Sequence, residues 1–248
     1  MPFFFHQYHR RSADHAAGTD SRLFQRTEDW PKEWKTIYYK SYAGVRTIPL
    51  TKTAPPPTNF FDIVANRKSV NGAHEHGISI ADLSAILKYS CGLQDTVRHT
   101  SGVKLRAQPS GGMRFPLEVY VLSLKKENGI APGVYHFNVK EHALNVLRVR
   151  AFSSQDILQM FTYPWAKDCS MAVLVTAVFN RTAMKYGERA YRYVLLEAGH
   201  IGQGMYLSAA PCGVGVTGMG GTQDEALHSL LDIDGTQESL VYALMLSK

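Results

Sequence analysis

The chain has 248 residues, of which 45% are hydrophobic and 19% charged, and its net charge is +6. That is enough apolar sequence for a packed core, and the basic balance permits an anionic partner such as a phosphate-bearing cofactor. The basic residues are scattered, without a zinc-finger spacing, an arginine-rich run or an aromatic RNA-binding motif, so nucleic acid is not an expected partner.

The first 57 residues are predicted to form an arm that is extended or wraps a partner, rather than a packed unit. Its polar residues show no helical or strand period, while Trp30 and Trp34 offer aromatic anchors. The triplet Pro55-Pro56-Pro57 favours a stiff, extended backbone. It is expected to separate the arm, residues 1–57, from a second region, residues 58–248.

Regular patterns begin after the proline triplet. A short helix is expected to end near Ser69. Ser79 followed by Asp82 has the spacing of a capping box, for a helix that Gly92 closes. Runs rich in valine, tyrosine and leucine then predict three strands, at residues 117–124, 133–137 and 143–149.

A second group of elements completes the chain. Residues 171–179 form a continuous apolar run, typical of a central strand buried on both faces. Residues 188–210 carry an apolar stripe at helical spacing and predict the longest helix. The other predicted elements are a helix capped by Ser153 or Ser154, a strand at 214–216, a helix capped by Thr222 with Glu225, and a strand at 240–246. Because helices and strands mix without a βαβ alternation, the pattern predicts an α+β fold with a mixed or antiparallel sheet.

The three cysteines, Cys91, Cys169 and Cys212, are far apart and odd in number, so neither a disulfide framework nor a Cys-x-x-Cys metal site is indicated. A reducing, cytoplasmic location is therefore expected. The apolar residues near the N-terminus are too few for a signal peptide, and no apolar run has the length of a membrane span. No membrane partner is expected.

Lys185 and Tyr186 are the most informative pair of side chains. They stand just before the long helix pattern, where a phenol next to an ammonium group can act as a general base. Lowering the pKa of the phenol from about 10 to about 7 requires about 4 kcal/mol of differential stabilisation. Adjacent helical residues do not share a face, so both can point into one pocket only if they precede the regular helix. The simplest alternative is a solvated lysine beside a packing tyrosine.

Three further segments contain residues suited to binding a cofactor. In Arg67-Lys68-Ser69, two cations and a hydroxyl can hold a phosphate. The glycines of Pro109-Ser110-Gly111-Gly112 allow a flat ligand to approach the backbone. Thr217-Gly218-Met219-Gly220-Gly221, expected between a strand and a helix, offers amides free of side-chain bulk. Neither glycine segment has the spacing of a phosphate loop or a dinucleotide fingerprint. Taken alone, Pro109 to Gly112 favours a tight surface turn, and the second segment is compatible with a flexible connector.

Glu197 and His200 are three residues apart in the predicted long helix and could bind a metal together. A di-metal helical site requires a second pair of this kind, and the sequence has none. A polar pair in the core or at an interface is favoured, and no metal is expected.

In order and spacing these segments resemble the nitroreductase-like flavoproteins, and within them the SagB-type azoline dehydrogenases. The resemblance covers most of the chain after about residue 60. The motifs that carry it are, in chain order, Arg67-Lys68-Ser69, Tyr89-Ser90-Cys91-Gly92, Pro109 to Gly112 leading into Pro116-Leu117-Glu118-Val119-Tyr120, Gly133-Val134-Tyr135-His136, Arg181-Thr182 with Lys185-Tyr186-Gly187, Glu197-Ala198-Gly199-His200, and Gly220-Gly221.

The resemblance implies a three-layer α+β fold and a homodimer with FMN at the subunit interface. It places the FMN phosphate on Arg67 and Ser69, the isoalloxazine ring against Pro109 to Gly112, and Met219 to Gly221 near the N5 edge of that ring. It assigns catalysis to Lys185 and Tyr186. Where the phosphate motif usually has a third basic residue, this chain has Asn71, and Lys68 or Lys248 could take its place; Gly204 stands where an asparagine is common.

The implied reaction is the FMN-dependent oxidation of a peptide thiazoline or oxazoline to the aromatic azole, in the biosynthesis of a modified peptide natural product. Tyr186 would remove the acidic ring proton, Lys185 would stabilise its phenolate, and a hydride would leave for FMN. The expected partners are an azoline-containing peptide, a second copy of the chain, a cyclodehydratase complex, and dioxygen as electron acceptor. Two alternatives remain open: an NAD(P)H-dependent nitro- or quinone reductase on the same fold, and a non-catalytic flavoprotein-like scaffold in a peptide-modifying complex.

Overall fold

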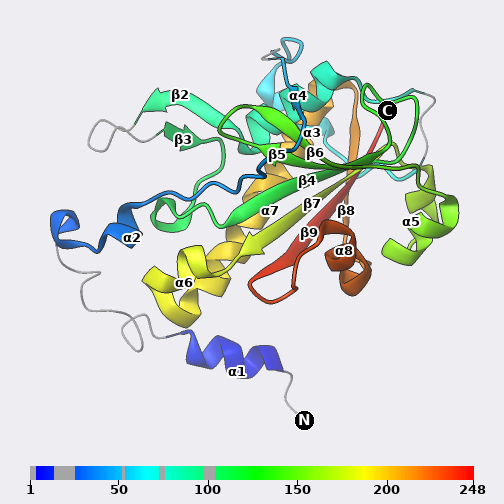
Figure 1. Ribbon diagram of the computed structural model, residues 1–248. Coiled ribbons are helices and arrows are strands. Elements are labelled where there is room, and N and C mark those ends of the chain that lie inside the picture. The colour runs from blue at the N-terminus through cyan, green and yellow to red at the C-terminus, as the bar shows by residue number, and fades with distance from the viewer. Residues whose placement is uncertain (1–3, 14–25, 52–53, 73–75, 98–103) are drawn as a thin grey trace.

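A seven-stranded sheet runs through the middle of the molecule, in the order β1-β6-β5-β4-β7-β9-β8 (Figure 1). The computed structural model describes residues 4–13, 26–51, 54–72, 76–97 and 104–248. The strands are β1 (Thr47–Pro49), β4 (Leu117–Ser123), β5 (Gly133–Asn138), β6 (Ala143–Val149), β7 (Met171–Val178), β8 (Gly215–Met219) and β9 (Glu238–Ser247). Neighbouring strands are antiparallel. A separate hairpin pairs β2 (Leu93–Val97) with β3 (Lys104–Arg106).

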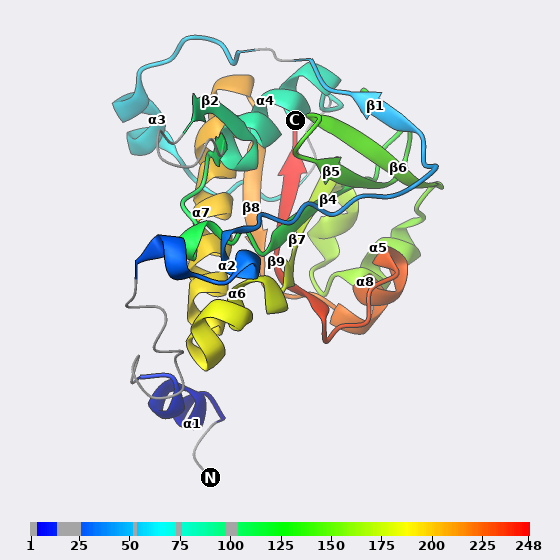
Figure 2. The ribbon, with the colours of Figure 1, turned by 60° about the vertical axis from the view of Figure 1, so that its left-hand side comes forward.

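Helices cover both faces of the sheet (Figures 1 and 2). α4 (Ile80–Cys91) and α7 (Ala190–Ala209) lie over one face, and α5 (Ser154–Met160) and α8 (Asp224–Leu231) lie over the other. The remaining helices are α1 (Phe4–Arg11), α2 (Lys32–Lys35), α3 (Phe60–Asn66) and α6 (Asn180–Tyr186), with 3-10 turns at Thr27–Asp29, Gly111–Met113, Pro164–Asp168, Gly187–Arg189 and Ala210–Cys212. The predicted α+β fold, with helices on both sides of a large sheet, is confirmed.

The central strand β7 shows how the two faces are built. Val173 and Val175 point into a core shared with α4 and α7, whereas Ala172 and Leu174 point into a core shared with α5 and α8. All four side chains are buried. Burying a valine or leucine side chain contributes about 1.5–3 kcal/mol, so a strand covered on both faces favours apolar residues along its length. Thr176 is the polar exception in β7, and its hydroxyl donates to Glu238 Oε1 at 2.7 Å. The predicted central strand is confirmed.

Local signals set the ends of two helices as predicted. The Ser79 hydroxyl accepts a hydrogen bond from the Asp82 amide at 3.0 Å, and Gly92 follows the last residue of α4. Ser153 and Asp156 form a reciprocal capping box at α5. Such caps stabilise a helix because its first amides have no partner within it.

Several predicted boundaries are wrong. The Thr222–Glu225 cap does not form: Thr222 Oγ1 donates to Asp224 Oδ1 instead, and α8 begins after Gln223. β8 continues through Met219 because its ladder with β9 pairs Thr217 with Met245 and Met219 with Ala243. Thr217 to Met219 therefore belong to a strand and not to the predicted connecting loop.

The described part of the predicted arm contacts the rest of the chain (Figure 2). β1 pairs with β6 at the edge of the sheet. Lys40 Nζ lies 2.5 Å from Glu238 Oε2 of β9, and Tyr8 donates to the Glu188 carbonyl at 3.0 Å. Residues 1–3, 14–25 and 52–53 of the arm lie outside the described residues. The division of the chain at residue 57 stays a prediction.

Within the described ranges, no helix combines the length and the apolar character that crossing a membrane requires. The three cysteines, Cys91, Cys169 and Cys212, are buried with free thiols. Burial raises the pKa of the Cys91 thiol to about 11, so this cysteine is held in the unreactive thiol form.

Candidate functional site

The Lys185–Tyr186 pair is carried by a short helix at the end of the central strand. β7 ends at Val178, and the chain turns directly into α6, whose last two residues are Lys185 and Tyr186. Gly187 ends α6 with a φ of +54°, a conformation that favours glycine, and α7 begins three residues later. The pair therefore precedes the long helix, but it belongs to a helix of its own that the sequence pattern did not indicate.

The polar ends of Lys185 and Tyr186 converge on Gly112. A Cβ atom on Gly112 would collide with the Tyr186 hydroxyl and would lie 3.1 Å from Lys185 Nζ. Gly111 packs against the ring of Tyr193 in α7, and this ring meets Tyr186 edge to face with 5.0 Å between centroids. The fold thus brings the predicted catalytic pair against the predicted segment Pro109 to Gly112.

Replacing Gly112 with alanine should test this packing. Gly112 has a φ of +60°, so an alanine there is strained by its backbone and also collides with Tyr186. We expect Gly112→Ala to lower the free energy of unfolding by about 2–4 kcal/mol in urea titrations. Gly44→Ala is the matched control because Gly44 has a φ of +74° with no heavy atom of the described residues within 4 Å of its Cβ position. Its cost should be only about 1–2 kcal/mol. Equal losses for the two variants would contradict the close contact.

Lys185 is buried, and no carboxylate of the described residues is paired with it. Its exposed fraction is 2%, and its Nζ lies 3.6 Å from the centre of the Trp30 ring. No Asp or Glu of the described residues lies within ion-pair distance of it. Burial, reinforced by the nearby Arg114 guanidinium, lowers the pKa of Lys185 to about 8. About a tenth of the amine is therefore neutral at pH 7, and this neutral form can accept a proton.

Tyr186 does not fit the phenolate expected from the sequence. Burial and the neighbouring Tyr193 raise the pKa of the Tyr186 phenol above its ordinary value, and the opposing effect of Arg114 is smaller. The hydroxyl is therefore protonated at neutral pH. The geometry favours Lys185 as the proton acceptor of the pair and Tyr186 as a hydrogen-bond donor beside it.

A buried carboxyl group of α7 lies next to the same segment. Gln108 Nε2 donates to Glu197 Oε1 at 3.3 Å, and burial raises the pKa of Glu197 to about 7, although Ser110 and Gln108 oppose this by hydrogen bonding. The Gln108 side-chain oxygen is buried with no hydrogen-bond partner among the described residues. His200 is exposed. Glu197 and His200 thus have different surroundings.

A buried ion pair anchors the start of α6. Arg181 Nη1 lies 2.6 Å from Glu118 Oε1 of β4 and donates to the Phe115 carbonyl at 3.2 Å. The other Glu118 oxygen accepts from His136 Nε2 at 2.8 Å, while His136 Nδ1 accepts from Asn145, which assigns the proton to Nε2. Arg181 precedes Lys185 by one helical turn, so this network fixes the helix that presents the pair. Arg181 belongs to one of the predicted motifs, but no role was predicted for it.

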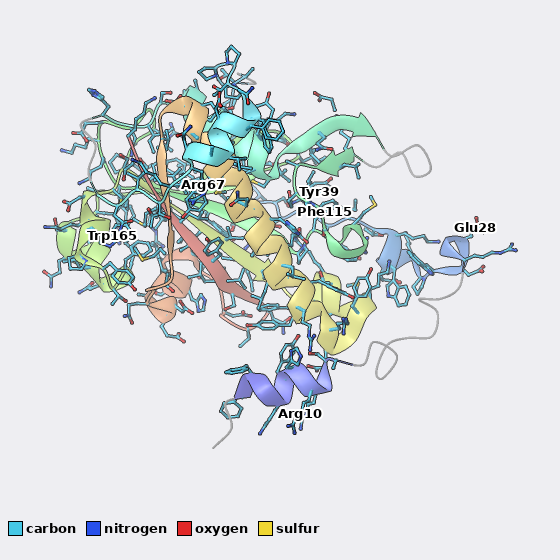
Figure 3. The ribbon with its side chains drawn as sticks, turned by 180° about the vertical axis from the view of Figure 1, so that it is seen from behind. Arg10, Glu28, Tyr39, Arg67, Phe115 and Trp165 are labelled. Atoms are coloured by element: carbon cyan, nitrogen blue, oxygen red, sulfur yellow. The ribbon has the colours of Figure 1, made fainter. Side chains whose placement is uncertain are left out.

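The predicted phosphate motif lies beside α7, nearer to the C-terminal end of that helix than the Lys185–Tyr186 pair (Figure 3). The Arg67 guanidinium stacks 5.3 Å from the centre of the Tyr206 ring, and Ser69 Oγ is 3.1 Å from Tyr206 Oη. Arg67 and Lys68 line a cavity of about 410 Å³ together with Tyr206 and Val216. Two exposed cations beside a cavity are suited to an anion.

The position of the usual third cation, Asn71, and the two lysines that could replace it differ in their surroundings. Asn71 is exposed. Lys248 Nζ lies 2.6 Å from Asp82 Oδ2, so its charge is already paired at the start of α4. Lys68 is the one of the two lysines that lines the cavity beside Arg67.

The Lys185–Tyr186 pair and the Arg67 motif do not lie at the same place within one chain. The helical rise of α7 separates Tyr193, beside the Lys185 pair, from Tyr206, beside Arg67, by about 20 Å. Met219 is buried at the end of β8, and the Gly221 carbonyl accepts from the Thr162 amide at 2.8 Å.

The amides of the second glycine segment are only partly available. The Gly218 amide donates to Tyr206 Oη at 2.7 Å, so it is not free for a ligand as the sequence suggested. Gly220 is exposed, and no heavy atom of the described residues lies within 4 Å of its Cβ position.

Comparison with known proteins identifies relatives of the chain. The model of the Nitroreductase family matches residues 64–248. The candidate nitroreductase MJ1384 of Methanocaldococcus jannaschii is 28% identical over 172 residues, which cover 69% of this chain and 83% of that protein. The trifolitoxin-processing protein TfxB of Rhizobium leguminosarum bv. trifolii is 30% identical over 194 residues, which cover 74% of this chain and 52% of TfxB. The chain thus spans about half the length of TfxB.

Solved structures share the fold. A candidate nitroreductase from Anabaena variabilis superposes with a TM-score of 0.74 at 29% identity, over 97% of this chain and 45% of that one. The E. coli microcin synthetase McbBCD complex with truncated pro-MccB17 gives 0.64 at 17% identity, over 99% and 91%. A candidate nitroreductase from Desulfovibrio desulfuricans, solved in complex with FMN, gives 0.53 at 15% identity, over 77% and 86%.

The family match covers most of the chain. It includes the Arg67 motif, the Lys185–Tyr186 pair and every strand of the seven-stranded sheet except β1. The matched region also has the antiparallel sheet, flanked by helices, that the solved relatives share. The chain belongs to the nitroreductase family.

Proposed function

We propose that this chain is an FMN-dependent dehydrogenase that oxidises peptide thiazolines or oxazolines to azoles in the biosynthesis of a modified peptide natural product. The observation that carries the proposal is the buried amine of Lys185, held with Tyr186 against Gly112 and with a pKa lowered to about 8. A reductase that takes its hydride from NAD(P)H has no need of such a base. The likeness to TfxB, which processes trifolitoxin, and to a microcin synthetase bound to a pro-peptide supports a peptide substrate.

The residues fit FMN at both of its ends. Arg67 and Lys68 offer two cations at a cavity of about 410 Å³, which suits the phosphate. Gly111 and Gly112 bear no side chain where the backbone meets Tyr186, and the unpartnered Gln108 oxygen can accept a hydrogen bond from a ring N–H. Bound FMN would supply the hydride acceptor, with dioxygen as the final oxidant.

The roles of the pair follow from their protonation. The ring carbon between the imine and the carbonyl of an azoline carries an acidic proton, and the neutral amine of Lys185 accepts it. The protonated Tyr186 hydroxyl donates a hydrogen bond to the negative charge that develops on the substrate. The substrate loses one proton and one hydride, and the ring gains one double bond.

The proposal includes a homodimer. α7 exposes apolar side chains, with Leu195 exposed by 42% and Leu196 by 63%, as expected for a helix covered by a second copy. Within one chain the Arg67 motif and the Lys185 pair are about 20 Å apart. A second copy could bring its own Arg67 motif to the Lys185 pair of the first. A cyclodehydratase that makes the azoline is the expected partner complex.

The rate of azoline oxidation should rise with pH through about 8. Only the neutral amine of Lys185 accepts a proton, and it predominates above its pKa of about 8. We therefore expect a rate that increases about tenfold per pH unit well below 8 and levels off above it. Measuring kcat over pH 5.5 to about 10 tests this. A profile that is flat or falls with pH would contradict a lysine base.

The proposal is tested with the purified chain, FMN, and a peptide carrying one azoline ring. Mass spectrometry should show a loss of about 2 Da per ring under air. The likeness to the candidate nitroreductase MJ1384 favours a nitro- or quinone reductase as the second candidate. Rapid NAD(P)H oxidation coupled to nitro or quinone reduction, with no change in the azoline, would replace the proposal by that alternative. A protein that stays colourless with added FMN would indicate a scaffold.

A further inference from the structure

Residues 26–35, here called the tryptophan segment, are fastened beside the candidate site. The segment contains the turn Thr27–Asp29 and the short helix α2. The indole N–H of Trp34 donates to the Met184 carbonyl at 3.0 Å, directly before Lys185 in the chain. Arg114 Nη1 donates to the Glu33 carbonyl at 2.8 Å. Two hydrogen bonds therefore attach the segment to α6 and to the residue after the Gly111–Met113 turn.

Trp30 lies directly over the Lys185 amine. Nζ is 3.6 Å from the centre of the Trp30 ring and 5.9 Å from that of Trp34, and the two indoles meet edge to face at 6.1 Å. A cation over an indole face is attracted to it, and the ring also excludes water. Lys185 is only 2% exposed although it is a lysine near the surface end of a short helix.

Among the described residues, the charged and titratable groups facing Lys185 come from few elements. Arg114, which follows the Gly111–Met113 turn, is positive and disfavours the ammonium form. Tyr186, on the same helix, places its ring 5.4 Å from Nζ, and its own neighbour is Tyr193 of α7. The tryptophan segment presents indole rings to the amine. Exclusion of water is thus the main cause of the lowered Lys185 pKa. Of the three aromatic rings near Nζ, that of Trp30 is the nearest.

We propose that the tryptophan segment is a cover over the site, and that Trp30 is the positioning residue that shields Lys185 from water. The inference rests on the proposed role of Lys185 as proton acceptor and adds a specific function for the N-terminal region. Without the Trp30 ring, the ammonium form loses its attraction to the indole face, but water reaches Nζ and solvates that form. Because desolvation is the largest cause of the lowered Lys185 pKa, the gain in hydration outweighs the lost attraction. The amine would then be neutral only at higher pH, and the base would be less available under neutral conditions.

The direct test measures the protonation and accessibility of Lys185 without using turnover. The full-length, FMN-loaded protein is labelled with trace acetic anhydride across a pH series, and acetylation of each lysine is read by mass spectrometry. In the wild type we expect slow labelling of Lys185 with a midpoint near pH 8. In Trp30→Ala the midpoint should rise by at least about one pH unit, a tenfold change in the acid–base equilibrium, and the plateau rate should increase. Trp30→Phe, which keeps a ring over Nζ, should restore most of the wild-type behaviour.

Lys40 is the internal control, because it is paired with Glu238 and should label equally in all variants. If Lys40 labelling rises in Trp30→Ala, that variant has lost its fold, and Trp34→Phe decides instead. Trp34→Phe removes the hydrogen bond to Met184 and should raise Lys185 labelling to an intermediate level. Unchanged Lys185 labelling in the folded variant overturns the cover.

The labelling experiment and the azoline assay can overturn the cover and the proposed function independently of each other. A wild type that forms no azole at any pH, but whose Lys185 midpoint shifts in Trp30→Ala, would overturn the reaction and leave the shielding in place. Azole formation with an unshifted Lys185 midpoint would overturn the cover alone. When both hold, the pH–rate profile of Trp30→Ala should move upward by the same amount as the labelling midpoint.

Discussion

Replacing Lys185 with alanine is expected to lower the rate of azole formation by about 10²–10⁴-fold, with FMN retained. The reason is the loss of the proton acceptor, since no carboxylate of the described residues is paired with this position and the Tyr186 phenol is protonated at neutral pH. The measurement is single-turnover conversion of an azoline peptide, followed by mass spectrometry, with flavin content determined from the absorption spectrum of each variant.

Lys185→Arg is the matched control that separates proton transfer from charge. Arginine keeps a positive charge and comparable length but is not deprotonated in proteins. The account therefore expects Lys185→Arg to be as inactive as Lys185→Ala. If Lys185→Arg retained a rate near that of the wild type, Lys185 would act as a fixed charge and the assignment of the base would be wrong. Tyr186→Phe should reduce the rate less than either lysine variant, because it removes a hydrogen-bond donor and not the base.

Glu118→Gln is expected to lower the free energy of unfolding by about 3–5 kcal/mol. The carboxylate is 5% exposed and pairs with Arg181 at 2.6 Å while accepting from His136 at 2.8 Å. An amide in its place leaves the Arg181 guanidinium buried without a counter-charge. Urea titration should show this as a lower midpoint with an unchanged slope. Glu141→Gln, at an exposed glutamate, should change stability by no more than about 0.5 kcal/mol.

The Glu118 carboxylate also makes the free energy of unfolding depend on pH. The hydrogen bond from His136 and the charges of Arg181 and Arg106 outweigh burial and lower the pKa of Glu118 to about 2. Because the pKa in the folded state lies below the value of about 4.3 for an unfolded chain, the stabilisation is fully present above about pH 4.3 and is lost as the pH falls toward 2. The wild type should therefore lose stability faster than Glu118→Gln over this interval. Parallel losses in the two proteins would show that Glu118 is not the group responsible.

Elements set by local chemistry could be predicted well. Ser79 and Ser153 cap helices because their hydroxyls accept from amides three residues ahead. β7 is apolar except at Thr176 because both of its faces are covered. The predicted strand at 214–216 was too short because the glycines of β8 weaken any local strand signal, while its ladder with β9 is a contact between distant segments. The edge strand β1 likewise depends on β6, a partner far along the chain.

The candidate site was predicted as separate motifs, and the fold adds what joins them. The convergence of Lys185, Tyr186 and Gly112 depends on how α6 leaves β7, which no local pattern specifies. Trp30 and Trp34 were recognised as aromatic anchors, but their contact with Lys185 spans about 150 residues of sequence. The predicted phenolate failed because adjacency to a lysine suggested a charge effect, whereas burial governs the pKa of Tyr186.

The central claim is that the chain takes a proton and a hydride from an azoline. Its most direct measurement is an anaerobic single turnover, in which the FMN-loaded protein is mixed with an azoline peptide and, separately, with NAD(P)H. We predict that the azoline peptide bleaches the yellow flavin, that each bleached flavin corresponds to one ring lighter by about 2 Da, and that Lys185→Ala slows both changes by about 10²–10⁴-fold. Bleaching by NAD(P)H, with a flavin that stays yellow and a peptide that stays unchanged in the azoline sample, would contradict it.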